Sequence, residues 1–437
     1  MTLKRRNFIG LTGMAAATGL VAGLASCTSK EEENEKAAVT ADSALQPMTG
    51  DVQPISLSER ESRIAKAQRL LAENQMDALL LDAGTALNYF TGISWWPSER
   101  TMVAIIPAKG EVKYVCPGFE EDRLRELITL GTEVYAWQED ESPYKLIATV
   151  LKDAGMAHNT LALEERTRFF IADGIQKEAP NLKMVSGDAV TIPCRLIKSP
   201  AEIKLMQKAS DITIAAIQYG VSQLQEGMTQ DDLAAIITRA QQQMGGSGAG
   251  GLVLFGTSSA FPHGSTQPQR LKKGDIVLMD CGCKVEGYSS DITRTIVFGA
   301  APTQRQTEIW ELEKAAQAAG FNAAQIGAPC ENVDAAARKV IVDAGFGPGY
   351  QLPGLPHRTG HGIGMDGHEW GNMVKGNQLL LQPGMCFSIE PTIAIPGEFG
   401  VRFEDCVYMT EEGPKWFTQP SKSLSEPFAC CGSATTT

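Results

Sequence analysis

Acidic side chains stand in two apolar, strand-like segments in the second half of this chain. Asp280 and Asp291 belong to the first segment, and Glu390 and Glu404 belong to the second. An isolated carboxylate is costly to bury, and no matching run of basic residues accompanies these four. Cations must therefore neutralise them, and a cluster of four carboxylates suits a pair of divalent metal ions.

Histidines gather in the same half of the chain. The chain has five histidines, and His158 is the one that lies outside this region. His361 is flanked by Gly360 and Gly362, which allow close approach of backbone and substrate. Imidazole beside carboxylates favours Mn²⁺, Zn²⁺, Fe²⁺ or Co²⁺ over Mg²⁺ or Ca²⁺. The remaining histidines of the region are His263, His357 and His368.

The two acidic segments look like copies of each other. Asp280 follows Leu271-Lys272-Lys273-Gly274, and Glu390 follows Leu381-Gln382-Pro383-Gly384 at the same distance from the glycine. In each copy a second acid stands in the next apolar run. The spacing predicts an internal duplication, with two strand pairs related by a pseudo-twofold axis and the four carboxylates between them.

Helices and strands must position these residues. Ser58 to Glu61 matches a capping box that would begin a helix, and Thr229 is expected to cap another. Residues 55–195 alternate between helical and strand-like patterns, which predicts a small α/β domain. The expected strands are 78–81, 102–108, 111–116 and 161–163, and the expected later helices are 201–221, 229–244, 303–319 and 331–344.

The composition is that of a globular protein. The chain has 437 residues, of which 43% are hydrophobic and 21% charged, and its net charge is −12. These values exclude a mostly disordered chain, and the negative charge argues against nucleic acid as a partner. The ten cysteines include no CxxC pair, so a thiolate zinc site is not expected.

The first residues are typical of an export signal. Arg5-Arg6 precedes an apolar run from Gly10 to Leu24 and resembles a twin-arginine signal, and Leu24 to Cys27 resembles a lipobox. The alternative is a plain secretory signal with a chance arginine pair. We expect cleavage after residue 26, lipidation of Cys27, a flexible tether over 27–54, and a membrane-anchored lipoprotein on the periplasmic side or the cell surface.

The ordered set Asp280, Asp291, His361, Glu390 and Glu404 resembles the pita-bread metallopeptidases, the family of methionine aminopeptidase, proline dipeptidase and Xaa-Pro aminopeptidase. The stretch 287–295 is similar to the form in the proline-specific branch, and the spacing of His357, His361 and His368 resembles the Xaa-Pro aminopeptidase pattern. The resemblance implies an α+β fold, with a pita-bread catalytic domain of duplicated strand–helix halves over 196–420. A smaller α/β creatinase-like domain over 55–195 would precede it, and a polar tail would follow over 421–437.

The resemblance also implies a role for each site residue. Asp280 would bind one metal ion, Asp291 and Glu404 would bridge two, and a water between the two ions would be the nucleophile. The other expected roles are metal binding by His361 and Glu390, general-base catalysis by Glu390, contact with the scissile amide by His263 and His368, and lining of the proline pocket by His357 and Arg402. Arg402 could instead only pair with one of the acids. The expected ions are two divalent metals, with Mn²⁺ first and Zn²⁺, Co²⁺ or Fe²⁺ as alternatives.

The first functional hypothesis is an Xaa-Pro aminopeptidase that acts on peptides with an N-terminal Xaa-Pro. The alternatives are a proline dipeptidase, a metal-free amidinohydrolase like creatinase, and a binding module built on an inactive domain. The resemblance also implies a homodimer or a larger homo-oligomer, with the membrane reached only through Cys27. One departure from the family pattern is Trp370, which follows His368-Glu369 where a proline is usual.

Overall fold

A computed structural model describes residues 45–156, 158–424 and 426–428. The expected signal sequence and the lipidated Cys27 lie outside these residues and stay predictions, as does most of the tether. In the described part of the tether, the Met48 amide donates to the carbonyl oxygen of Met244, and Asp51 pairs with Lys208. None of the described helices combines the length and the apolar character that crossing a bilayer requires.

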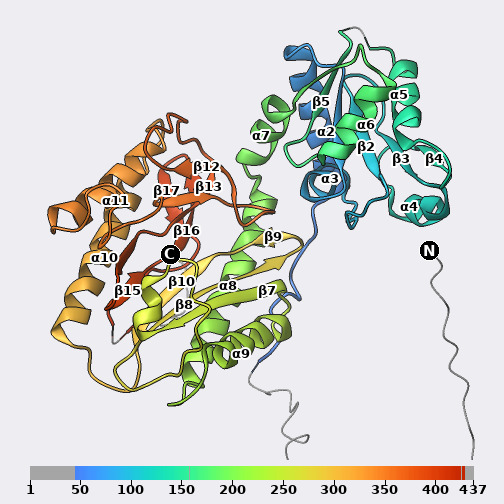
Figure 1. Cartoon of the computed structure of the whole chain (residues 1–437). Coiled ribbons are helices and arrows are strands. Elements are labelled where there is room, and N and C mark those ends of the chain that lie inside the picture. The colour runs from blue at the N-terminus through green and yellow to red at the C-terminus, as the bar shows by residue number, and fades with distance from the viewer. Residues whose placement is uncertain (1–44, 157, 425, 429–437) are drawn as a thin grey trace, which may run out of the picture. The chain divides into compact units, whose positions relative to one another are not determined.

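The first part of the described chain is built around a six-stranded mixed sheet in the order β4-β3-β2-β1-β5-β6 (Figure 1). The predicted hairpin is confirmed, since β2 pairs with β3 in antiparallel fashion, and β1 pairs in parallel with β5. The elements are α2 (Leu57–Glu73), β1 (Ala78–Asp82), α3 (Thr85–Thr91), β2 (Val103–Pro107), β3 (Lys113–Pro117), α4 (Glu121–Leu127), β4 (Glu133–Trp137), α5 (Pro143–Asp153), β5 (Thr160–Leu163), α6 (Phe169–Glu178), β6 (Lys183–Ser186) and α7 (Asp188–Leu196).

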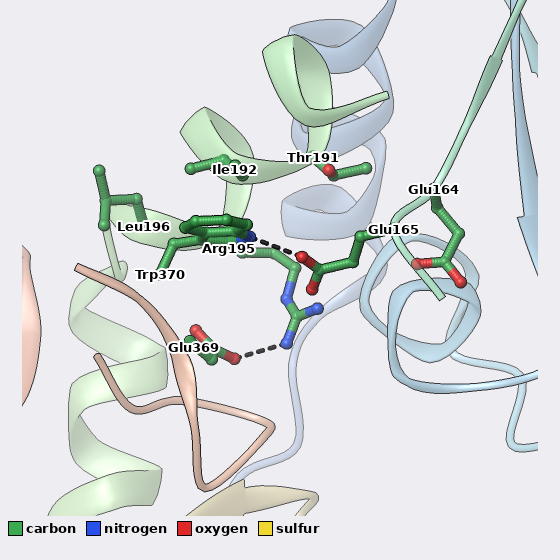
Figure 2. Close-up of a pocket in the computed structure, with 8 residues that line it drawn as sticks. All are labelled: Glu164, Glu165, Thr191, Ile192, Arg195, Leu196, Glu369 and Trp370. Atoms are coloured by element: carbon green, nitrogen blue, oxygen red, sulfur yellow. Dashed lines mark hydrogen bonds and ion pairs between the residues drawn. The ribbon is translucent and has the colours of Figure 1, made fainter. Parts of the chain in front are cut away.

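The loop after β5 meets α7 and a segment from the second half of the chain. Glu164 and Glu165 of this loop, Arg195 of α7, and Glu369 and Trp370 line a cavity of about 20 Å³ (Figure 2). That volume is enough for one water molecule. Burial of the Glu164 carboxyl raises its pKa to about 7.

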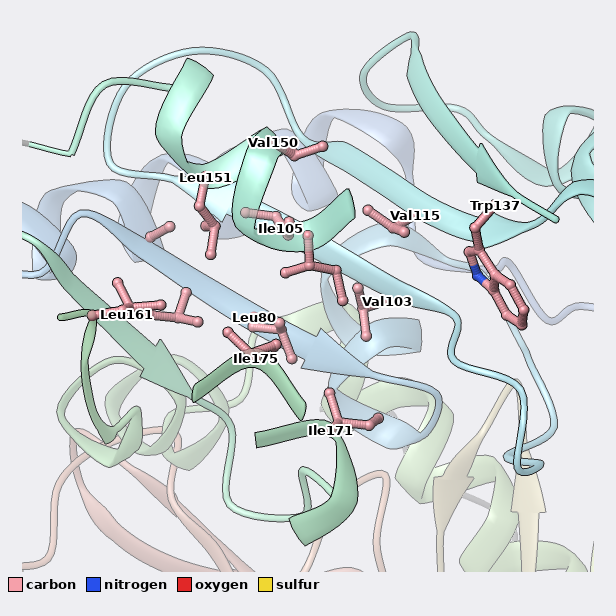
Figure 3. Packing of buried hydrophobic residues seen from close by; sticks show 13 residues of the cluster. Leu80, Val103, Ile105, Val115, Trp137, Val150, Leu151, Leu161, Ile171 and Ile175 are labelled. Carbon is pink, nitrogen blue, oxygen red and sulfur yellow. The ribbon is translucent and has the colours of Figure 1, made fainter. Parts of the chain in front are cut away.

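Apolar residues of the first sheet pack against α5 and α6 (Figure 3). Leu80 and Ile105 of neighbouring strands are fully buried beside Val150 of α5 and Ile175 of α6. The burial pattern of β1 is continuous, as expected for a strand that is covered on both faces.

The predicted start of the first helix is wrong by two residues. Helix α2 begins at Leu57, and its N-cap is Ser56, whose hydroxyl accepts a hydrogen bond from the Glu59 amide. Ser58 lies inside the helix. Two serines stand two positions apart here, and either could have supplied the capping oxygen.

The second part contains the expected catalytic fold. Thr229 caps α9 in a full capping box with Asp232, as predicted. Four cysteines that the sequence places in apolar runs are free and buried, namely Cys281, Cys283, Cys386 and Cys406. The elements are α8 (Pro200–Ser222), α9 (Gln230–Gln243), β7 (Ser247–Phe255), β8 (Ile276–Val285), β9 (Tyr288–Ser289), β10 (Ile292–Val297), α10 (Gln304–Ala323), α11 (Glu331–Asp343), β11 (Gly360–Gly362), β12 (Glu369–Met373), β13 (Cys386–Ile389), β14 (Thr392–Ile395), β15 (Phe399–Arg402), β16 (Asp405–Thr410) and β17 (Gly413–Trp416).

The predicted duplication is present in the hydrogen bonds. In the first copy, Leu271 is fully buried, and its carbonyl oxygen accepts from the Gly227 amide after α8. In the second copy, Leu381 is fully buried, and its carbonyl oxygen accepts from the Gly327 amide after α10. Each helix pair therefore leads into an equivalent strand segment with its acid, Asp280 within β8 and Glu390 directly after β13, in agreement with the expected pita-bread fold.

Candidate metal centre

All nine predicted metal, catalytic and substrate residues of this domain line one cavity of about 390 Å³. The cavity lies among β8, β10, β13, β15 and the loops that join them. Spacing alone predicted the convergence of the four carboxylates, whereas the family resemblance implied the places of His263, His357, His368 and Arg402. The lining residues are His263, Asp280, Asp291, His357, Arg358, His361, His368, Glu390, Arg402 and Glu404.

The first duplicated half contributes Asp280 and Asp291. Strands β8 and β10 are antiparallel, with Thr293 opposite Asp280. Thr293 also bridges to Glu404 of the second half, and its hydroxyl donates to Glu404 Oε2 at 2.9 Å. One threonine thus holds the two halves in register. As a result, carboxylate oxygens of Asp280, Asp291 and Glu404 lie within 4.8 Å of one another.

The second half contributes His361 and Glu390. His361 Nε2 lies 3.0 Å from Glu390 Oε1, 3.9 Å from Glu404 Oε1 and 4.0 Å from Asp291 Oδ2. Its other ring nitrogen, Nδ1, lies 3.1 Å from the Gly362 carbonyl oxygen. That contact favours a proton on Nδ1, so that Nε2 is the nitrogen that would bind a metal ion among the carboxylates.

The glycines beside His361 serve the backbone rather than the substrate. A Cβ atom on Gly360 would lie 1.9 Å from the Ser388 carbonyl oxygen, and one on Gly362 would lie 1.9 Å from that of Trp370. The neighbouring strands therefore pack too closely for any side chain at either position. This packing fixes the position of the His361 ring.

The prediction that all four acids lie inside strands is wrong for three of them. Asp280 lies within β8, whereas Asp291 directly precedes β10, Glu390 directly follows β13, and Glu404 stands between β15 and β16. Their exposure also differs, since the side chain of Glu404 is 2% exposed and that of Asp280 is 26% exposed. Strand ends release the side chains from the sheet pattern, so that they can converge on one point.

Burial and the neighbouring charges shift the pKa values of the acids and of His361 in this centre. Enclosure raises the pKa values of Asp291 and Glu404 well above their usual range, and the neighbouring carboxylates add to that effect. Burial also opposes ionisation of Glu390, but the hydrogen bond and the charge of His361 lower its pKa. Burial disfavours the charged form of His361, yet Glu390 raises the pKa of that imidazole. Protons thus compensate part of the charge that a divalent cation would compensate.

The donor set fits divalent cations. Glu404 Oε1 is buried and meets no hydrogen-bond donor among the described residues. The candidate ligand atoms form three groups, and within each group the atoms lie within 4.8 Å of one another. The groups share members, and the shared carboxylates are those of Asp291 and Glu404. Oxygen ligands with one imidazole suit the metals expected from the sequence.

Arg402 forms an ion pair with one of the acids, which was the alternative to lining the proline pocket. Its Nη2 lies 2.5 Å from Asp280 Oδ2, and its Nη1 donates to the Pro262 carbonyl oxygen. The side chain still forms part of the cavity wall. Arg402 therefore orients Asp280 as well as facing the cavity.

Three further histidines surround the carboxylates. The His368 ring lies over that of His361, with 3.9 Å between centroids, and burial together with the charge of His361 lowers the pKa of His368 to about 4. His357 Nε2 lies 3.0 Å from the Thr392 hydroxyl, and burial lowers its pKa. His263 is exposed and lines the cavity from the loop before β8.

Arg358 is a cavity residue that the sequence analysis missed. Its Nη2 lies 3.1 Å from His368 Nδ1. A single arginine between two histidines matches no spacing rule, and only the fold turns its side chain toward the cavity. The wall therefore carries a second cation besides Arg402.

Comparisons with known proteins agree with this architecture. A model described as "Metallopeptidase family M24" matches residues 204–411, and one described as "Creatinase/Prolidase N-terminal domain" matches residues 63–197. An Xaa-Pro dipeptidase of Lactobacillus delbrueckii subsp. lactis is 33% identical over 365 residues, which cover 82% of this chain and 97% of that protein.

Solved structures give the same result. A prolidase from Thermococcus sibiricus is similar with a TM-score of 0.74 and 31% identity, over 82% of this chain and 97% of the other. An X-Pro aminopeptidase from Thermotoga maritima is similar with a TM-score of 0.69 and 25% identity, over 81% of this chain and 97% of the other.

Proposed function

Because the chain belongs to metallopeptidase family M24 and carries the creatinase/prolidase N-terminal domain, we propose that it is a metal-dependent Xaa-Pro dipeptidase. The sequence motifs favour an Xaa-Pro aminopeptidase, but the relatives support the alternative. Among the solved structures, the prolidase is 31% identical, whereas the X-Pro aminopeptidase is 25% identical. The complete set of ligand residues in one cavity argues against a metal-free amidinohydrolase and against an inactive binding module.

One observation carries the choice of a dipeptide. Arg358 stands beside His368 in the cavity wall. A dipeptide ends one residue after its scissile bond, and one residue spans about 3.8 Å between Cα atoms. A cation next to the group that holds the scissile amide is therefore within reach of the free carboxylate. A longer peptide has no charge at that place.

The residues of this chain divide the work of hydrolysis. Two divalent cations, when bound, would polarise the scissile carbonyl and lower the pKa of a water molecule. Glu390 accepts a proton from the attacking water and passes it to the proline nitrogen as the bond to that nitrogen breaks. His263 and His368 donate hydrogen bonds to the carbonyl oxygen as it gains charge. An Xaa-Pro bond has no N–H for the enzyme to hold, so binding rests on the two ends of the substrate and on the proline ring.

The metal and the setting are part of the same proposal. Asp280, Asp291, His361, Glu390 and Glu404 would hold two ions, with Mn²⁺ as the first expectation. The substrate would be an Xaa-Pro dipeptide outside the cytoplasm, with the enzyme tethered by lipidated Cys27. A homodimer or a larger homo-oligomer stays a prediction.

Replacing Arg358 with methionine tests the choice of substrate. We expect KM for an Xaa-Pro dipeptide to rise about 10- to 100-fold, because a charge-assisted hydrogen bond is lost. The measurement compares the dipeptide with its C-terminal amide, Xaa-Pro-NH₂, in the parent protein and in Arg358→Met. The parent protein should prefer the free acid, and the variant should lose that preference. Equal preference in both proteins would remove Arg358 from carboxylate recognition.

A further inference from the structure

The loop of one hairpin carries His368. Strands β11 and β12 pair in antiparallel fashion, with Gly362 opposite Glu369, and residues 363–368 join them. We give the name His368 arch to residues 363–370, which are this connection and the first two residues of β12. Because His361 lies on β11 and His368 directly precedes β12, the shape of this arch decides how the two rings meet. Their centroids lie 3.9 Å apart.

Asp366 ties the arch to the first domain. Its Oδ1 accepts hydrogen bonds from the Thr85 hydroxyl at 2.8 Å and from Arg166 Nη1 at 3.0 Å. Its Oδ2 accepts from Arg195 Nη2 at 2.6 Å. Thr85 begins α3, Arg166 follows β5, and Arg195 lies near the end of α7. A single carboxylate thus joins the arch to three separate segments of the chain.

Glu369 forms a second and more enclosed link. Its two oxygens pair with Arg195 at 2.6 Å and with Lys198 at 3.0 Å. The side chains of Glu369 and Lys198 are 7% and 1% exposed, so water competes little for these ion pairs. Glu369 is the residue next to His368.

Trp370, where the family usually has proline, adds a third link. Its indole Nε1 donates to Glu165 Oε2 at 2.6 Å. Figure 2 marks this hydrogen bond with a dashed line. A proline has no side-chain donor and could not make this bond. Trp370 and Glu165 are both exposed to solvent, so this link can be changed without disturbing the core.

We propose that Asp366, Glu369 and Trp370 are positioning residues, through which the first domain holds the His368 side chain in place for hydrolysis. The inference rests on the proposed function, in which His368 contacts the scissile amide. A displacement of about 1 Å in such a group is enough to cost as much as a hundredfold in rate.

Two sets of variants test the proposal on the full, metal-loaded chain. Asp366→Asn should lower kcat for an Xaa-Pro dipeptide about 30-fold, with KM within about twofold of the parent value and metal content unchanged. At the surface, Glu165→Leu should lower kcat about fivefold. Glu165→Gln keeps an oxygen acceptor for Trp370 and should have the parent kcat. The matched control is Glu121→Gln, which breaks the exposed pair with Arg125 in the same domain and should leave kcat unchanged.

The outcomes separate the two proposals. Unchanged kcat in both Asp366→Asn and Glu165→Leu, with an active parent protein, overturns the positioning role and leaves the dipeptidase intact. A loss in Glu165→Leu that Glu165→Gln does not restore also overturns it. If Asp366→Asn fails to fold, the Glu165 pair decides. A parent protein that binds metal but cleaves no Xaa-Pro dipeptide overturns the proposed function and this inference with it.

Discussion

Replacing Asp291 with asparagine is expected to lower kcat/KM for an Xaa-Pro dipeptide by about a thousandfold, because a shared ligand of both proposed ions is weakened. Asp291 belongs to two of the three groups of candidate ligand atoms. An amide keeps the shape of the side chain but loses the charge that attracts a cation. Bound metal, measured by elemental analysis, should fall together with activity.

A surface aspartate provides the control for that experiment. Asp343 pairs with Lys339 at the exposed end of α11, and its side chain is 61% exposed. Asp343→Asn should keep both metal content and activity. A fully metallated and fully active Asp291→Asn protein would contradict the assignment of the centre.

Replacing Glu390 with glutamine is expected to lower kcat by about 10²- to 10⁴-fold, the range associated with loss of a general base. Glu390 lies 3.0 Å from His361 Nε2, and the hydrogen bond and charge of His361 lower its pKa, which keeps the carboxylate in the ionised form that a base requires. Glutamine cannot accept that proton. KM should change much less than kcat, which steady-state kinetics on one dipeptide would reveal.

Glu398→Gln is the matched control, because Glu398 lies in an exposed pair with Arg305. It should leave kcat unchanged. A Glu390→Gln variant that keeps more than about a tenth of the parent kcat would mean that another group serves as the base.

The ligand set was predictable because it repeats. Asp280 and Glu390 stand at equal sequence distances from Gly274 and Gly384, and the structure places the two acids at equivalent positions in the two halves. The buried Leu271 and Leu381 hold equivalent strand starts, so equal spacing in sequence gives equivalent positions in space. The strand at 78–81 was predictable because a short, continuous apolar run is typical of a buried strand, and the strand at 111–116 was predictable as the second strand of a hairpin.

Other features depend on contacts that sequence patterns do not encode. Ser56 rather than Ser58 caps α2, and local spacing cannot distinguish two serines that stand so close together. The roles of Arg358 and Trp370 depend on partners that the fold brings to them, His368 across the β11–β12 turn in one case and Glu165 of the first domain in the other. The departure at Trp370 was visible in the sequence, but only the fold supplies its acceptor.

The most direct test is the hydrolysis of an Xaa-Pro dipeptide by the protein before and after chelation. The account predicts that the chelated protein is inactive and that Mn²⁺, or another of the expected divalent ions, restores turnover. It also predicts that Xaa-Pro-Yaa tripeptides are poor substrates under the same conditions. Continued turnover of the dipeptide after complete removal of metal, or cleavage of the tripeptide alone, would contradict the proposal of a metal-dependent Xaa-Pro dipeptidase.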